Sequence, residues 1–488
     1  MNTRKTKVLI VGAGPAGLAC ARELSKAGVP FILLEKESSV GGLARTYTFE
    51  EDGLVFRTDN GPHRFFSKNK YLYEFIEELL QEKWITVRRQ TRQLIDGKFY
   101  DYPINLMQAL RNIGFLNAVL MGIDYAYAQI HYKLLKKPIV SFEDYVVANF
   151  GKRLGRFNMI NYTEKIWGIP ATTIHPDWAG QRIKGLDFGS VIKNALQRIF
   201  KRSRNEGPKT LIESFYYPQF GTGLIYETIT NDLKERGYEV ICDAKVRSVV
   251  HNKHTIEKVI VEKDGEEFAI ECETLIESIP LPAFTRLFSP SVPQEIEMAA
   301  RELRHRSQVY LFITLDKPSI TLDQWIYFPT ERVPFARVSE MKNFSADMSP
   351  HDKTSLFVEF FCFKDDAVWN MSQDELFELA IPHFEELGFF TRSEVRRHYH
   401  IKKEDIYPIY DLEYKKYLSV VKDYLDRFEN LYYIGRPGRF KYNNQDHSLE
   451  MGILAAKSII DNTRYDIESV GEEKEYFEKG AVPTKTTE

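Results

Sequence analysis

Three glycines near the start of the chain have the spacing of a phosphate-binding turn. Gly12, Gly14 and Gly17 follow the apolar run Lys7–Val11 directly. At such a turn the first glycine permits a tight bend, the second lets the backbone approach a pyrophosphate, and the third lets a helix pack closely on a strand. The helix predicted over Ala16–Lys26 would offer free N–H groups and a partial positive charge to the phosphates.

An acidic residue stands where a nucleotide-binding unit needs one. Pro30–Leu34 predicts a second strand, and Glu35 with its neighbour Lys36 comes at the end of that strand. An acidic side chain about twenty residues after the glycines bonds a ribose hydroxyl group. Strand, glycines, helix and acid together predict a dinucleotide site. Its cofactor contacts would include Gly12, Gly14, Ala16, Gly17, Glu35 and Lys36.

A second glycine motif indicates which dinucleotide binds. Val40–Thr46 reads VGGLART, which resembles the second fingerprint of FAD enzymes of the amine oxidase and glutathione reductase type. Close glycines again permit backbone approach, and Arg45 can pair with a phosphate or with the flavin edge. We therefore favour FAD over NAD, with Gly42, Leu43, Ala44 and Arg45 as contacts.

Composition excludes several classes of function. Hydrophobic residues make up 43% of the 488 residues, charged residues 28%, and the formal net charge is −3, so bulk nucleic-acid binding is not expected. The four cysteines have neither zinc nor disulfide spacing. The histidine pairs at 251/254 and 398/400 lack a carboxylate or cysteine cluster, so no metal site is predicted. The amino terminus runs straight into a strand, and a cytoplasmic protein without a signal peptide is expected.

The apolar stretch at residues 115–131 is interrupted by Asn117, Asp124 and Gln129. These polar residues make it a poor membrane span. A buried or amphipathic helix is the favoured interpretation.

The pattern of elements predicts an α/β fold with a discontinuous Rossmann-like FAD-binding domain. Pieces of that domain occur at the start, middle and end of the chain, separated by a helical region and by a region of strands and helices. The predicted division is residues 1–100, 205–285 and 427–465 for the FAD-binding domain, 101–204 for a helical substrate domain, 286–426 for a mixed sheet at the flavin face, and 466–488 for a mobile tail.

Several motifs along the rest of the chain resemble one superfamily. They are Gly61-Pro62-His63, Lys165–Pro170, Trp178–Arg182, Trp325–Pro329 with Pro334–Arg337, and Tyr442–Ser448. Roughly residues 7 to 460 resemble FAD proteins of the protoporphyrinogen oxidase and UDP-galactopyranose mutase type. Within that superfamily, the long eukaryotic-type mutases are the most similar.

The resemblance implies a flavin-dependent isomerase. Such a mutase interconverts the pyranose and furanose rings of a nucleotide sugar through N5 of reduced flavin, and it serves surface polysaccharide synthesis. NAD(P)H is a candidate external reductant, and a homo-oligomer is compatible with the family. The alternatives are an FAD-dependent oxidase or desaturase of the protoporphyrinogen oxidase or amine oxidase type, and a flavoprotein that only binds.

The resemblance also places residues in roles. His63 would lie at the flavin, and Arg182 and Arg337 would clamp a diphosphate, because guanidinium groups bind phosphate oxygens in pairs. The remaining flavin contacts would be Gly61, Pro62, Gly435, Arg436, Asp446, His447 and Ser448. The remaining substrate contacts would be Tyr102, Asn105, Thr163, Trp167, Tyr327, Tyr407, Tyr442 and Asn444. Without the resemblance, structural ion pairs explain the arginines and core packing explains the tyrosines; for Trp167, packing is favoured.

Three positions depart from the family pattern. Pro62 replaces a glycine, and proline fixes φ and lacks an N–H, so a backbone flip at residue 62 is restricted. Asn105 stands where the family tends to have Gln, and Thr163 where it tends to have Asn. The base and the sugar therefore need not be those of UDP-galactose.

Overall fold

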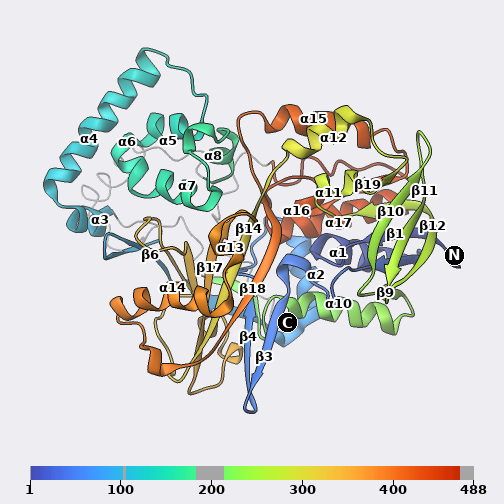
Figure 1. Ribbon diagram of the computed structural model, residues 1–488, viewed down its shortest axis with the longest axis horizontal. Coiled ribbons are helices and arrows are strands. Elements are labelled where there is room, and N and C mark those ends of the chain that lie inside the picture. The colour runs from blue at the N-terminus through green and yellow to red at the C-terminus, as the bar shows by residue number, and fades with distance from the viewer. Residues whose placement is uncertain (1, 103–105, 183–213, 473–488) are drawn as a thin grey trace.

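The computed structural model describes residues 2–102, 106–182 and 214–472, and these form two large sheets joined by helices (Figure 1). The first sheet has the order β13-β10-β11-β12-β1-β2-β9, and β19 pairs with β12. Its core strands β19, β12, β1, β2 and β9 run parallel. The bounds are β1 (Asn2–Val11), β2 (Phe31–Leu34), β9 (Glu239–Ile241), β10 (Lys245–His251), β11 (Ile256–Lys263), β12 (Glu266–Glu277), β13 (Phe288–Ser289) and β19 (Leu431–Tyr433).

Helices cover both faces of this sheet, as the near-continuous apolar strands require. Val8 and Ile10 of β1 face one core, whereas Leu9 and Val11 face the other. The helices of the first core are α1 (Pro15–Lys26), α2 (Lys70–Leu80), α10 (Gly223–Glu235) and α17 (Gln445–Ile460). Those of the second are α11 (Leu281–Thr285), α12 (Gln294–Glu302) and α15 (Tyr414–Leu425). The predicted α/β fold is confirmed.

The second sheet has the order β18-β14-β17-β16-β15-β6-β7. Its strands are β6 (Thr91–Ile95), β7 (Lys98–Asp101), β14 (His305–Leu315), β15 (Trp325–Tyr327), β16 (Arg337–Glu340), β17 (Thr354–Cys362) and β18 (Val395–Pro408). The short α13 (Ala367–Asn370) lies beside it, and α14 (Gln373–Glu386) packs on one of its faces. The opposite face carries Tyr327, Arg337 and Glu359 in one cross-strand row.

The two sheets do not follow the predicted domain boundaries everywhere. β6 and β7 belong to the second sheet, although residues 1–100 were assigned to the FAD-binding domain. Likewise α12 and α15 pack on the first sheet, although 286–426 was assigned to the flavin-face sheet. The alternation of apolar residues predicts a strand or a helix, but it carries no information on which sheet the element joins.

The helical region predicted from residue 101 onward is present over the described residues 106–182. It comprises α3 (Leu106–Ile113), α4 (Phe115–Gln129), the π-helical η3 (Ile130–Leu134), α5 (Phe142–Phe150), α6 (Lys152–Leu154), the π-helical η4 (Gly155–Ile160), α7 (Asn161–Trp167) and α8 (Asp177–Arg182). Ser141 and Asp144 form a capping box at the start of α5. α4 is helical as expected but much of its apolar surface is exposed, so the buried alternative is wrong. Among the described residues, no helix is long and apolar enough to cross a membrane.

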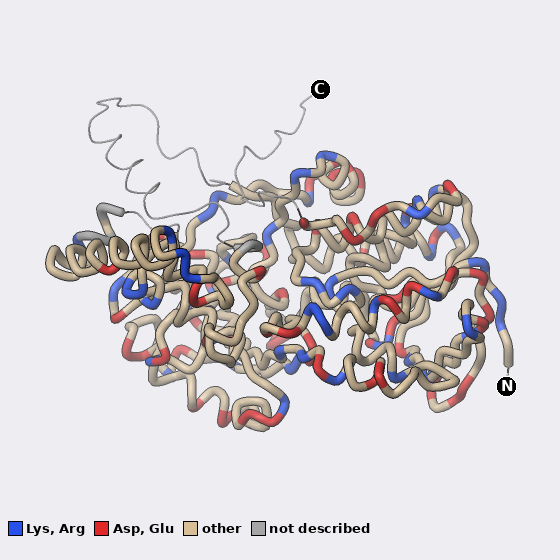
Figure 2. Tube along the Cα trace, turned by 90° about the horizontal axis from the view of Figure 1, so that it is seen from above, with Lys and Arg blue, Asp and Glu red and all other residues tan. Residues whose placement is uncertain are grey.

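Two two-stranded sheets complete the described structure. They pair β3 (Thr46–Glu51) with β4 (Leu54–Asp59), and β5 (Trp84–Arg88) with β8 (Ser214–Pro218). Short 3-10 turns are η1 (Gly42–Ala44), η2 (Gln81–Lys83), η5 (Ala171–Thr173), η6 (Met341–Asn343), η7 (Ala346–Met348) and η8 (Arg392–Glu394), and the short helix α16 (Gly435–Gly438) precedes α17. Basic and acidic residues are interspersed along the described chain (Figure 2).

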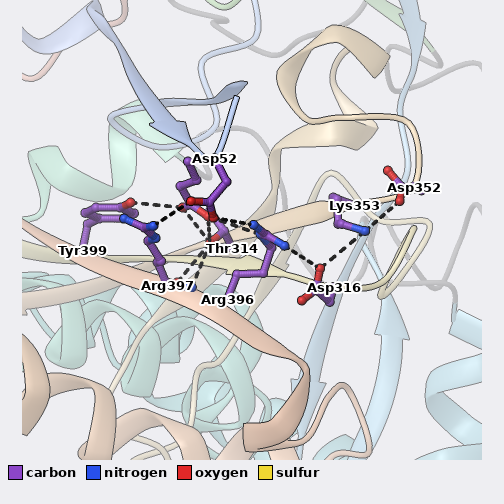
Figure 3. Close-up of polar contacts among 9 residues, drawn as sticks. Asp52, Thr314, Asp316, Asp352, Lys353, Arg396, Arg397 and Tyr399 are labelled. Atoms are coloured by element: carbon purple, nitrogen blue, oxygen red, sulfur yellow. Dashed lines mark hydrogen bonds and ion pairs between the residues drawn. The ribbon is translucent and has the colours of Figure 1, made fainter. Parts of the chain in front are cut away.

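A buried carboxylate ties the β3–β4 hairpin to the second sheet. Glu51 is fully buried and accepts hydrogen bonds from Thr314 Oγ1 (2.8 Å) and Tyr399 Oη (3.1 Å). Arg396 lies 3.4 Å from it and also pairs with Asp316 at 2.9 Å. Figure 3 shows this network, which continues through Asp52, Arg397, Lys353 and Asp352. The hairpin that precedes the His63 loop is thereby fixed to β14 and β18.

The carboxyl-terminal segment is ordered further than predicted. Ile467 and Val470 are buried in the first core, and Glu468 and Glu472 pair with Lys422 (2.6 Å) and Lys441 (3.1 Å) respectively. The prediction of a mobile tail is therefore wrong for residues 466–472, and 473–488 lie outside the described residues. Ile467 and Val470 are isolated apolar residues in a charged stretch, so the sequence pattern did not predict that this segment packs on the core.

Candidate functional site

The glycine turn after β1 has the geometry that the sequence predicts. Gly12 has φ +100°, and a Cβ at that residue would lie 2.2 Å from Ser278 Oγ. A Cβ at Gly17 would lie 1.9 Å from the carbonyl oxygen of Gly12. The chain can therefore pass from β1 into α1 only with glycine at these positions. The N–H groups of the first turn of α1 are left at the carboxyl end of the sheet.

The second glycine motif closes over the first. The Gly41 N–H donates to the carbonyl oxygen of Ala13 at 2.8 Å. A Cβ at Gly42 would lie 3.2 Å from the Cα of Gly14. Leu43 and Ala44 follow in η1, and the half-buried Arg45 lies 3.6 Å from Glu37 and over the Tyr47 ring. Its Nε is buried and has no hydrogen-bond partner among the described residues.

Glu35 is buried at the end of β2, but its partners are backbone groups. Its carboxylate accepts from the N–H of Ala13 (2.8 Å) and the N–H of Glu37 (3.0 Å), while burial raises the pKa of Glu35. The carboxylate thus fixes the glycine turn, and its remaining lone pairs are those that a ribose would use. Lys36 is exposed and lies 3.9 Å from Glu37.

A third element, α16 with the start of α17, completes the cradle. Gly435 has φ +76°, and a Cβ there would lie 3.2 Å from Ala16. Asn444 caps α17, with His447 Nδ1 accepting from the Asn444 N–H at 3.3 Å. Asp446, His447 and Ser448 are buried at this helix start. Two helix starts and two glycine loops meet here, and these residues fit the pyrophosphate of FAD.

The loop that carries His63 lies beside this cradle. Gly61 has φ +106°, and a Cβ there would lie 3.3 Å from Arg337 Nη2 and 3.2 Å from Glu359 Oε1. The His63 N–H donates to the Gly61 carbonyl across Pro62 at 2.9 Å. Nδ1 of His63 is buried and has no hydrogen-bond partner among the described residues. The loop therefore brings an imidazole to the second sheet, next to an arginine.

Asp59 anchors this loop, and sequence reasoning missed it. The buried carboxylate accepts from Thr46 Oγ1 (2.6 Å), Tyr217 Oη (2.6 Å), and both Oγ1 (2.8 Å) and N–H (3.1 Å) of Thr222. Thr222 Oγ1 also lies 3.3 Å from the carbonyl oxygen of His63. Burial raises the pKa of Asp59. A lone acid after a strand and a threonine between two glycines were the signals available.

Replacing Asp59 by alanine is expected to destabilise the protein by ~3 kcal/mol or more. The substitution leaves several buried donors without an acceptor, each at a cost of about 1–3 kcal/mol. The measurement is urea unfolding followed by circular dichroism. Asp352→Ala, at an exposed ion pair, is the control and should unfold like the wild type. Equal midpoints for the two variants would contradict the role of Asp59.

The cross-strand row on the second sheet forms the charged centre of the site. Arg337 donates through Nε (2.5 Å) and Nη2 (2.7 Å) to the two carboxylate oxygens of Glu359, which is fully buried. Gln308 Nε2 donates to the same carboxylate at 3.2 Å. Glu359 was not among the predicted residues, although a single charge inside the apolar strand SLFVEFFC is a usable signal. Arg337 was predicted to hold a diphosphate, and two of its three guanidinium nitrogen atoms are hydrogen-bonded to a carboxylate.

Aromatic side chains wall the site on the side of the helical region. Tyr407 and Tyr442 stack with ring centroids 5.6 Å apart, and the Arg436 guanidinium lies over both rings at 5.1 and 5.2 Å. Trp167 packs edge-on against Tyr407 (6.0 Å) and against Trp178 (4.7 Å). Trp167 is buried, as the packing interpretation expected, and its indole Nε1 has no hydrogen-bond partner among the described residues.

A second aromatic group lies at the β15 end of the row. Tyr327 lies 5.2 Å from Tyr102 and 5.3 Å from Tyr162, by ring centroids. Tyr162 was not predicted; it lies one residue before Thr163, which is buried on α7. Tyr102 is partly exposed, as an entrance residue would be.

Three predicted substrate contacts stand apart from these aromatic groups. Asn105 lies outside the described residues. Arg182 ends α8, but its side chain is outside what the structure describes, so its role in a clamp stays a prediction. Asn444 is exposed on its outer side and its side chain caps α17. Among the described residues, no group of three or more histidine, cysteine, aspartate or glutamate side chains is placed to hold a metal ion.

Comparisons with solved structures agree with this fold. A crystal structure of reduced UDP-galactopyranose mutase superposes with a TM-score of 0.79 at 21% identity, covering 98% of each chain. A putrescine oxidase structure superposes with a TM-score of 0.61 at 18% identity, covering 94% of this chain and 100% of that one. At these identities the likeness shows the fold alone.

Matches to curated sequences cover a smaller share of the chain than these structural matches do. UDP-galactopyranose mutase of Mycoplasma pneumoniae is 25% identical over 202 residues, 37% of this chain and 45% of the relative. Phytoene desaturase (lycopene-forming) of Pantoea ananas is 25% identical over 285 residues, 53% of each chain. The chain thus spans about half the length of these curated relatives. The model of the family described as flavin containing amine oxidoreductase matches residues 15–402, so the chain belongs to the flavin-containing amine oxidoreductase family.

Proposed function

We propose that the protein is an FAD-dependent nucleotide-sugar mutase that interconverts pyranose and furanose rings. One observation carries the proposal: two arginines lie at the His63 loop among tyrosines. A Cβ at Gly61 would stand 3.3 Å from Arg337 Nη2, Tyr327 is the cross-strand neighbour of Arg337, and Arg436 lies over the rings of Tyr407 and Tyr442. A wholly apolar substrate gives no use for two guanidinium groups beside His63. A diphosphate does, because guanidinium groups bind phosphate oxygens through paired hydrogen bonds.

When bound, reduced FAD supplies the nucleophile at N5, so the protein's own task is to position the sugar and stabilise the leaving diphosphate. Glu359 holds the Arg337 side chain in one orientation through two hydrogen bonds. Arg436 is oriented by the carbonyl oxygen of Asn443, which accepts from Nε at 2.9 Å, and by the two tyrosine rings beneath it. Both cations are therefore held in one orientation, and in the proposed reaction they would stabilise the negative charge on the leaving diphosphate.

His63 supplies a neutral imidazole at the flavin. Burial, together with Arg436 and Arg337, lowers the pKa of His63 to about 3. The ring can then accept or donate one hydrogen bond without adding a third positive charge. The pH dependence of activity above pH 5 should therefore be the same in the wild type and in His63→Asn.

The same pKa shift predicts how stability depends on pH. His63 stays neutral in the folded state, whereas in the unfolded state it takes up a proton as pH falls below about 6.5. Stability from this residue is present above pH 6.5 and is lost as pH falls towards 3. Between pH 7 and 5 the wild type should lose up to about 2 kcal/mol more than His63→Asn in urea unfolding. His351→Asn, at an exposed turn, is the control and should lose as much stability as the wild type. If the difference in unfolding free energy between the wild type and His63→Asn is the same at pH 7 and pH 5, the lowered pKa of His63 is contradicted.

Pro62 limits any flavin-linked movement of this loop. A flip of the peptide into residue 62 would expose no N–H, because proline has none, and Gly61 and His63 are already joined by a hydrogen bond. We infer that His63 keeps its backbone conformation in both redox states. Oxidised and reduced crystals compared at residues 61–64 test this, and a flipped peptide would refute it.

Anaerobic turnover with a panel of nucleotide sugars tests the function itself. Dithionite-reduced protein should convert at least one nucleotide sugar to its furanose isomer by HPLC, while oxidised protein converts none; NAD(P)H is the candidate reductant to try in place of dithionite. If no sugar reacts and hydrogen peroxide is released with an amine or a polyene, the oxidase or desaturase alternative is correct. The family membership and the phytoene desaturase relative keep that alternative open.

A further inference from the structure

The outward face of α4 and η3 is unusually apolar for a surface helix. Phe115, Leu116, Ile123 and Leu134 are 86%, 72%, 61% and 73% exposed, and Tyr127 and Ile130 lie on the same side at 64% and 52%. We define these six side chains as the α4 face. Soluble monomers rarely expose a continuous apolar patch of this kind unless something covers it.

The polar residues of the helix point the other way. Gln129 Nε2 donates to the carbonyl oxygen of Ala148 in α5 at 2.8 Å, and Asp124 accepts from the N–H of Arg153 in α6 at 2.7 Å. Ala128 is buried against the same helices. α4 is thus inverted relative to an ordinary surface helix, which turns its polar side to water. Packing among the described residues does not account for its outward side chains.

Charge indicates what kind of surface fits this face. Residues 106–140 contain four basic side chains and one acidic side chain, a formal charge of +3, whereas the whole chain carries −3. Lys133 and Lys136 are exposed at the η3 end, and the one acid, Asp124, is engaged with α6. Lys137 is paired with Asp144 at 3.0 Å, which leaves Lys133 and Lys136 at one end of the apolar stripe. An exposed apolar stripe with lysines at its end fits an anionic membrane surface.

The position of the helix permits such contact. α4 lies at the outer edge of the described chain, away from the two sheets (Figure 1). A flat surface can therefore reach it without meeting the rest of the described chain. Among the described residues, no helix combines the length and the apolar character that a bilayer span requires.

We propose that the α4 face docks the protein reversibly on an anionic lipid bilayer. The apolar side chains would enter the boundary between headgroups and acyl chains, and Lys133 and Lys136 would lie among anionic headgroups. This inference does not depend on the nucleotide-sugar assignment, since it rests on a face remote from the flavin cradle.

Sedimentation of the holoprotein with vesicles tests the proposal. Vesicles of phosphatidylcholine with phosphatidylglycerol should bind the wild type, and high salt or phosphatidylcholine alone should weaken binding. The triple variant Leu116→Ser, Ile123→Ser, Leu134→Ser should lose roughly tenfold or more in affinity. Lys133→Ser with Lys136→Ser should remove the salt dependence. The matched control is Met298→Ser with Leu322→Ser, two other exposed apolar residues, which should bind like the wild type.

Three results would overturn the proposal. The first is the absence of vesicle binding by the wild type, and the second is equal binding by the triple variant. The third is a change in the oligomeric mass of the triple variant, measured by light scattering, without any vesicle binding, which would identify the face as a contact between copies of the chain. All substituted side chains are exposed, so each variant should fold. Retained flavin absorbance is the check that it does.

Discussion

Replacing Glu359 by alanine should destabilise the protein strongly and abolish most of its activity. Arg337 would keep its charge in a mostly buried position without a counterion, and breaking a buried pair in this way costs about 3–5 kcal/mol. The guanidinium would also lose both hydrogen bonds that orient it, so kcat/KM for the responsive nucleotide sugar should fall roughly 10- to 100-fold, equivalent to ~1.5–3 kcal/mol for a charged hydrogen bond. Urea unfolding and initial rates under anaerobic reduction give the two quantities.

A double variant separates stability from function. Arg337→Met with Glu359→Leu removes both charges and fills similar volume, and such replacements are often neutral or stabilising. Its stability should return close to that of the wild type while its activity stays low. Full recovery of activity would show that Arg337 does not touch the substrate and that the pair is only structural.

The pair Arg392–Glu378 is a matched control for this experiment. It has the same two-point geometry, at 2.5 and 2.7 Å, but both side chains are more than half exposed. Exposed pairs contribute little to stability because solvent screens them. Glu378→Ala should therefore change neither stability nor rate measurably. If it destabilises as much as Glu359→Ala, burial is not the cause of the large effect.

Local chemistry explains which parts of the site were predictable. The turn at Gly12–Gly17 follows from sterics within one βαβ unit, and so does the second glycine loop at residues 41–42. The sequence therefore determines these two glycine loops, whereas α16 and the start of α17 join them from the far end of the chain. Glu35 lies at the end of β2 as predicted, and its partners there are the backbone N–H groups of Ala13 and Glu37, so its contact with a ribose stays a prediction.

Non-local pairing explains what was missed. Asp59 and Thr222 are 163 residues apart, and nothing in either segment names the other. Glu359 is recognisable as a charge in an apolar strand, but its partner is set by the register of β16 on β17. The placement of β6 beside β15 is of the same kind, because parallel strands joined by a long connection leave no local turn signal.

Substituting Gly17 and Gly14 by alanine should separate folding of the cradle from binding of the cofactor. A Cβ at Gly17 would lie 1.9 Å from the carbonyl oxygen of Gly12, and backbone on both sides cannot move aside cheaply. Gly17→Ala should therefore destabilise even the apoprotein, by ~3 kcal/mol or more, since overpacking costs about 1–3 kcal/mol where side chains can still adjust. The variant should also be isolated without flavin absorbance.

Gly14→Ala should behave differently. A Cβ there meets only the Cα of Gly42 at 4.0 Å, so the apoprotein should unfold at nearly the wild-type urea concentration. The added methyl group would instead stand where the backbone must approach the pyrophosphate, and FAD affinity by titration should fall at least tenfold. Gly122→Ala in α4, where nothing lies within 4 Å, should retain flavin and gain up to ~1 kcal/mol from helix propensity. If Gly14→Ala binds FAD as the wild type does, the pyrophosphate does not lie against this turn, because the only atom that the substitution adds faces the space assigned to it.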